Sequence, residues 1–194
     1  MAEIKALIEG YARKIKGGWV ASSSVVLIKS CGKNIIVDPG CNREKLLLAL
    51  DSEGLKTGDI DFVILTHSHT DHTLLCGIFE NAKVLNSEEI YDDDMQVVHN
   101  GKIPGTDIQI IKTPGHSQEH CSVVVPTKKG IYAVAGDVFW WIDGEAQNVD
   151  VKKTDSSHPE ELDMKKLAES RKKLLELADF VIPGHGKMFE SKKQ

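Results

Sequence analysis

Three short apolar segments in different parts of the chain each lead into a glycine-containing turn and then a potential metal ligand. The ligands are His116, Asp137 and His185, and Asp38 lies in a similar segment near the N-terminus. Continuous apolar runs are typical of buried strands, and glycine allows a tight turn behind them. Strands that end in this way can bring side chains from distant parts of the chain to one point. The pattern therefore predicts packed sheets whose strand ends share a site.

The densest group of candidate ligands follows the apolar run 62–65. The next seven residues read THSHTDH, so three histidines and an aspartate lie within one loop. Loops at strand ends commonly carry reactive groups, and imidazole and carboxylate bind zinc, iron and manganese. One histidine behind a strand is usually a structural turn residue, but the repeated arrangement favours a site for two metal ions. Five of the eight histidines occupy such positions: His67, His69, His72, His116 and His185.

The length of 194 residues is sufficient for a core, and we expect a single domain over residues 1–194. Hydrophobic residues make up 41% and charged residues 27%, as in ordinary globular proteins. The formal net charge of −5 argues against strong non-specific binding to nucleic acids, although a local basic groove stays open.

The N-terminus does not have the layout of a signal peptide, and no apolar run is long enough to span a membrane. The four cysteines are scattered and form no Cys-x-x-Cys pair. We therefore expect reduced thiols in a cytoplasmic protein without a membrane partner. Oligomeric state stays open, with a dimer among the options.

Secondary-structure patterns predict an α+β protein in which helices cover packed sheets. We expect strands over 20–29, 34–37, 61–66, 82–85, 108–112, 121–126, 131–135 and 180–182. We expect helices over 43–50, 73–80 and 159–178, the last of them opening on Pro159.

The order of these motifs resembles the metallo-β-lactamase superfamily, and the resemblance covers residues 20–185. It implies a four-layer αββα sandwich of two mixed sheets. It also implies that His67, His69 and His116 hold one metal ion, and that Asp71, His72 and His185 hold a second. Asp137 would bridge both metals. Asp38 would support the His-rich loop from behind.

A dinuclear site of this kind implies hydrolysis by a metal-bridging hydroxide, because two cations depress the pKa of a shared water. Asp71 would orient this nucleophile and accept its proton, which makes it the candidate catalytic residue as well as a ligand. Zinc is the default metal, and iron and manganese suit the same donor atoms.

Several features narrow the resemblance. Asp137 replaces the cysteine of many β-lactamases, and His69 replaces the glutamate of flavodiiron oxygen reductases. Only nine residues follow His185. We therefore do not expect the glutathione-binding domain of glyoxalase II, the extra domain of the β-CASP nucleases or the protruding arm of tRNA 3′ processing enzymes. Segments around Asp137 and over 170–186 resemble an animal member regarded as an endoribonuclease.

Three functions remain. The first is a hydrolase acting on an ester, thioester or lactone of a small molecule, which the acidic composition favours. The second is a phosphodiesterase or endoribonuclease that binds nucleic acid, and the third is a non-catalytic metal-binding module. The complete set of candidate ligands argues against the third.

Residues near the candidate ligands admit structural and functional roles. His120 could contact substrate or shuttle protons, although we favour a partly exposed hydrogen-bonding residue. Phe139, Trp140 and Trp141 could form a pocket wall, core or a dimer contact. The basic residues between 165 and 173, including Arg171, are expected to form a solvated helix face.

Overall fold

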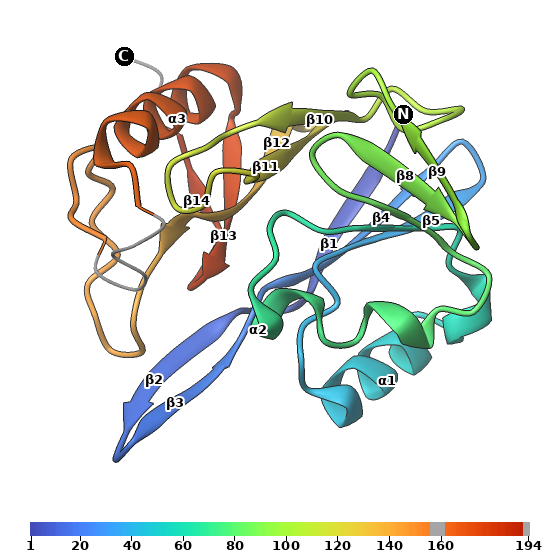
Figure 1. Ribbon diagram of the computed structural model, residues 1–194, viewed down its shortest axis with the longest axis horizontal. Helices are drawn as coiled ribbons and strands as arrows, with labels where there is room; N and C mark the ends of the chain where they lie inside the picture. Colours follow the sequence, from blue (N-terminus) through green and yellow to red (C-terminus); the bar gives the residue numbers. More distant parts are fainter. Residues whose placement is uncertain (156–161, 192–194) are drawn as a thin grey trace.

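The computed structural model describes residues 1–155 and 162–191, and these form two packed sheets with helices outside (Figure 1). The first sheet has seven strands, in the spatial order β1 (Glu3–Ile8), β4 (Val25–Ser30), β5 (Lys33–Val37), β6 (Phe62–Ile64), β7 (Lys83–Leu85), β8 (Glu89–Asp92) and β9 (Met95–Val98). The second has five, in the order β10 (Gln109–Lys112), β11 (Cys121–Thr127), β12 (Gly130–Trp140), β13 (Phe180–His185) and β14 (Phe189–Glu190). Both sheets are mixed, because β5, β6 and β7 run parallel, as do β12 and β13.

The buried apolar side chains form three clusters, one between the two sheets and one under each outer helix. Val26, Ile35 and Val37 of the first sheet pack against Val123 and Val134 of the second. Burial on both faces explains why these strands are nearly continuous apolar runs.

Two helices cover the outer faces of the sheets. Helix α1 (Arg43–Ser52) places Leu46 and Leu50 on the first sheet, and α3 (Met164–Leu177) places Leu167 and Leu174 on the second. The result is the expected four-layer αββα sandwich. No helix among the described residues is long and apolar enough to cross a membrane.

The N-terminal region differs from the expectation. The predicted strand 20–29 is divided between β3 (Gly18–Ser22) and β4, and β3 pairs with β2 (Tyr11–Ile15) in a separate two-stranded sheet. This hairpin projects from the body of the molecule (Figure 1). It is called the arm below and comprises residues 10–22.

The predicted helix over 73–80 was also wrong. A single turn, α2 (Thr70–Thr73), is followed by a 3₁₀ turn, η2 (Cys76–Ile78). The backbone amide of Leu75 donates to the carbonyl of Gly40, so this segment is tied to the loop after β5 instead of continuing a helix. A second 3₁₀ turn, η1 (Thr57–Asp59), precedes β6.

The last helix begins at Met164, where the Asp163 side chain accepts from the amides of Lys165 and Lys166. This is a normal N-cap. Residues 159–161, at which the helix was expected to open, lie outside the described residues. Its expected end near Ala178 is confirmed.

Candidate metal centre

The seven candidate ligands come from four places in or after strands. The loop after β6 and the turn α2 supply His67, His69, Asp71 and His72. His116 lies between β10 and β11. Asp137 lies within β12, and His185 is the last residue of β13.

The fold divides these residues into two groups that could each hold a metal ion. Ligand atoms of His67, His69, His116 and Asp137 lie within 4.8 Å of one another, and so do those of Asp71, His72 and His185. The structure thus brings the seven residues named from the sequence into two neighbouring groups.

Asp137 lies between the two groups. Its Oδ2 atom is 3.4 Å from His116 Nε2, and its Oδ1 atom is 3.2 Å from His72 Nε2 and 3.6 Å from His185 Nε2. One carboxylate therefore faces both groups of imidazoles, with a different oxygen directed to each.

Hydrogen bonds behind His67 and His72 fix which nitrogen faces this centre. The Thr66 hydroxyl donates to Asp38 Oδ2 at 2.7 Å, so it can only accept from His67 Nδ1, which lies 3.0 Å away. His72 Nδ1 donates to Asp38 Oδ2 at 2.8 Å. In both rings, Nε2 is therefore the nitrogen that faces the centre. Asp38 thus supports the His-rich loop as expected.

Two further imidazoles are held in the same way. His116 Nδ1 lies 2.7 Å from Asp155 Oδ2, and His185 Nδ1 donates to the carbonyl of Tyr11 at 3.1 Å. Such partners orient the ring of a ligating histidine and increase its basicity.

Buried polar atoms at the centre lack the hydrogen bonds that burial normally requires. Within the described part of the chain, His67 Nε2, His72 Nε2 and Asp137 Oδ1 are buried and make no hydrogen bond. Unsatisfied buried groups are costly and require an explanation. Convergent nitrogen and oxygen lone pairs would be satisfied by divalent cations, so the residues present fit a dinuclear site.

The electrostatics favour the coordinating forms of two of these groups. Burial lowers the pKa of His67 well below its usual value, so its imidazole is neutral. Burial opposes ionisation of Asp137, but His72, His185 and His116 outweigh it and hold the Asp137 pKa well below the usual range. Asp137 is therefore a carboxylate.

A cavity of about 650 Å³ opens directly onto the centre. Asp71, His116, Asp137 and His185 lie at its polar end. Its remaining wall is largely apolar and includes Ala12, Trp19, Ala21, Leu74 and Trp140.

The aromatic run after Asp137 serves two roles. Trp140 lines the cavity, whereas Phe139 and Trp141 are buried between the second sheet and α3. Alternation of side chains along a strand explains why Trp140 faces away from its two neighbours.

Two expectations about polar residues were wrong. His120 is fully buried, not partly exposed. Arg171 is 2% exposed and does not lie on a solvated face. Its guanidinium donates to the carbonyls of Val138, Val151 and Lys153 and thereby holds the segment between β12 and α3.

That segment carries Asp155, which the sequence did not identify. Its carboxylate is buried against His116, although the two residues are 39 positions apart. Asp155 follows no strand and belongs to no recognisable motif, so only the folded chain shows its position.

Replacing Asp155 with asparagine should weaken metal binding by about 10–100-fold, the usual cost of removing the partner that orients a ligating histidine. The substitution keeps the side-chain shape but removes the charge behind His116. Zinc affinity measured by competition with a chelating dye would test this. Asp150→Asn, at an exposed position of the same segment, is the control, and equal affinities in the two variants would contradict the assigned role.

Comparisons with known proteins point to one superfamily. Residues 18–185 match the model of the metallo-beta-lactamase superfamily. The chain is 32% identical to metallo-beta-lactamase domain-containing protein 1 of Xenopus laevis, over 96% of this chain and 80% of that protein. It is 33% identical to a protein of Methanocaldococcus jannaschii named "Probable metallo-hydrolase", over 78% of this chain and 70% of that protein.

Solved structures share the fold at lower identity. TTHA1623, solved in a di-iron-bound form, superposes with a TM-score of 0.60 at 22% identity, covering 88% of this chain and 91% of that one. AidC, a dizinc quorum-quenching lactonase, superposes with a TM-score of 0.61 at 16% identity, covering 86% of this chain and 74% of that one. The fold thus accommodates iron in one protein and zinc in another.

Proposed function

The chain belongs to the metallo-beta-lactamase superfamily, and we propose that it is a dinuclear metal-dependent hydrolase of small acyl substrates. The observation that carries this proposal is the convergence on Asp137 of four imidazoles whose Nδ1 atoms are hydrogen-bonded from behind, at the end of a cavity with a largely apolar wall. Esters, thioesters and lactones are the substrate class.

His67, His69 and His116 would hold one cation, and Asp71, His72 and His185 would hold the other, with Asp137 between them. When bound, two divalent cations lower the pKa of a shared water and polarise the scissile bond of the substrate. Zinc is our first choice of metal, and iron and manganese are the alternatives.

Asp71 is the proposed catalytic residue. Burial opposes its ionisation, but the neighbouring His185 and His72 together outweigh this, and the Asp71 pKa is lowered. Its Oδ2 atom lies 3.2 Å from His185 Nε2, and the residue lines the cavity. An ionised carboxylate there can orient an attacking water and accept its proton.

The apolar wall would bind the part of the substrate that does not react. Trp19 and Trp140 provide rigid area for an acyl chain or a ring. Displacement of water from this wall would also strengthen the electrostatic interactions at the polar end.

Hydrolysis of a thioester, a lactone and an activated phosphodiester by zinc- and manganese-loaded protein tests the proposal. We expect turnover of an acyl substrate that is lost in His116→Ala, because that variant removes one ligand of the first group. Turnover of the phosphodiester alone would contradict the acyl assignment. Absence of any hydrolysis by fully loaded protein would favour a non-catalytic metal-binding module.

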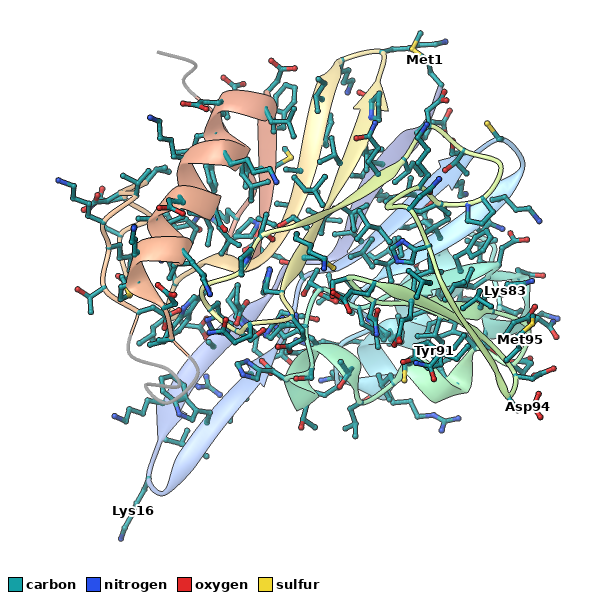
Figure 2. All side chains as sticks on the ribbon, turned by 45° about the horizontal axis from the view of Figure 1, so that its top comes forward. Met1, Lys16, Lys83, Tyr91, Asp94 and Met95 are labelled. Atoms are coloured by element: carbon teal, nitrogen blue, oxygen red, sulfur yellow. The ribbon has the colours of Figure 1, made fainter. Side chains whose placement is uncertain are left out.

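A second candidate is a phosphodiesterase or endoribonuclease, which the arm favours. Arg13, Lys14 and Lys16 are exposed on it, and residues 10–22 contain no acidic side chain. Figure 2 shows Lys16 at its tip, far from the body of the molecule. Trp19 is 47% exposed, with Lys14 Nζ 5.8 Å from its ring centre. Basic residues attract phosphates, and exposed aromatic rings can stack on bases.

If the arm binds a polyanion, Lys14→Gln combined with Lys16→Gln should reduce turnover of a single-stranded RNA several-fold. The dependence of log KM on log salt should become shallower by about one for each phosphate that the variant no longer binds. Turnover of a lactone should not change. Lys172→Gln, on the exposed face of α3, is the matched control, and an equal effect of both variants would exclude a specific role for the arm.

A further inference from the structure

The backbone on either side of Gly136 is irregular at the point where Asp137 enters the centre. Pairing between β12 and β13 shifts register on both sides of Gly136, whose φ is +54°. Among the described residues, Asp137 has no register partner in β11 or β13. Bulges of this kind redirect a side chain next to a site, but they leave backbone groups without ladder bonds.

A buried histidine accepts a hydrogen bond from the backbone amide that the bulge leaves without a ladder bond. The Asp137 N–H donates to His120 Nε2 at 3.1 Å, and His120 is fully buried. An added Cβ at Gly136 would lie 2.7 Å from the same nitrogen. His120 therefore fits tightly against the bulge.

A chain of hydrogen bonds runs behind His120, and the direction of each bond follows from the last one, between Ser122 and Ala135. The Ser122 hydroxyl donates to the carbonyl of Ala135 at 3.1 Å, and this uses its only proton. Thr113, whose hydroxyl lies 2.8 Å from that of Ser122, must then donate to it. Thr113 can therefore only accept from His120 Nδ1, at 3.0 Å.

These directions are mutually consistent. His120 carries its proton on Nδ1 and accepts the Asp137 amide at Nε2, as a neutral imidazole requires. Burial lowers the pKa of His120 to about 3, in agreement with this neutral form. All four hydrogen bonds of the chain from Asp137 to Ala135 are thereby assigned a donor and an acceptor.

The chain of hydrogen bonds also joins two ligand-bearing segments. The Thr113 amide donates to the carbonyl of His120 at 2.9 Å, which closes the loop that carries His116. The two ends of the chain, at Asp137 and Ala135, both lie on β12. Positions of His116 and Asp137 are thus coupled through side chains that do not line the cavity.

We infer that His120 is a positioning residue, whose Nε2 atom fixes the backbone of Asp137 so that its carboxylate lies between the two groups of ligands. Neither proton transfer nor metal ligation is assigned to it. This inference rests on the proposed metal centre, but not on the substrate of the enzyme.

Two substitutions at His120 distinguish the role of Nε2 from that of Nδ1. Glutamine can place an oxygen near the position of Nε2 and can still accept from the Asp137 amide. Asparagine reaches only the position of Nδ1 and can bond Thr113 alone. We expect His120→Asn to weaken Zn²⁺ binding by about 10–100-fold. His120→Gln should stay within about threefold of the parent protein if this acceptor is what matters.

Zn²⁺ affinity and stoichiometry, measured with a competing chelator on the full chain, distinguish these outcomes. His99→Asn and His99→Gln provide the matched controls, because His99 bonds Asn86 and Gly101 away from the centre. Equal weakening by both substitutions at His120, or no weakening by either, would overturn the inference.

Nitrogen-15 NMR of labelled histidine in the unsubstituted chain provides a second readout. We expect the His120 signals of a neutral ring protonated at Nδ1, and Thr113→Val should change them by removing the Nδ1 acceptor. A His120 ring protonated at Nε2 would overturn the inference. If the NMR and affinity results hold but no substrate is hydrolysed, only the proposed function fails.

Discussion

Asp137→Ala is expected to lower kcat/KM by at least about 10³-fold, because it removes several kcal/mol of charge stabilisation between two cations. Among the described residues, this carboxylate is the only group whose two oxygens each face a different set of imidazoles. Without it, no carboxylate between the two groups would offset the repulsion between cations held by His72, His116 and His185.

The measurement is the number of zinc ions bound per chain, together with turnover of the best substrate. We expect fewer than two ions in Asp137→Ala. Asp94→Ala, at the exposed turn between β8 and β9 (Figure 2), should keep both ions and full turnover. Retention of both ions and the full rate by Asp137→Ala would mean that the proposed site is wrong.

Gly184→Ala is expected to reduce turnover by about 100-fold, although the added group is a single methyl. A Cβ at this position would lie 1.8 Å from Asp137 Oδ1 and 2.9 Å from the carbonyl carbon of Gly136. Since neither atom can yield without displacing the Asp137 carboxylate, the site must shift, and misplacement by about 1 Å can cost about 10²-fold in rate. Overpacking should also cost about 1–3 kcal/mol of stability.

Thermal melting and kinetics of the same preparation separate these two effects. Gly77→Ala is the matched control, because an added Cβ there meets no atom within 4 Å. We expect near-parental turnover from this control and a clear loss from Gly184→Ala. Equal turnover would show that the backbone at Gly184 moves without cost, and the close approach would then have no role in placing Asp137.

Much of the fold could be predicted because buried strands have a distinctive composition. Strands β5, β6, β11 and β13 are apolar on both faces, so their sequences differ sharply from the polar turns around them. Strands β1, β2, β8, β9 and β14 were missed. Each is largely exposed or only partly buried, and its mixed sequence gives no strong period.

The sequence by itself determined the seven candidate ligands, because each lies directly behind or within an apolar strand and is of a type that binds metals. It could not identify Asp155 as the partner of His116, or His120 as the acceptor of the Asp137 amide. Nor could it show that Arg171 is buried. Strand composition is a local property that can be read along the chain. A hydrogen bond between residues 17 or 39 positions apart exists only after packing has fixed the distance between their segments, so the tertiary structure alone decided which polar residues support the ligands.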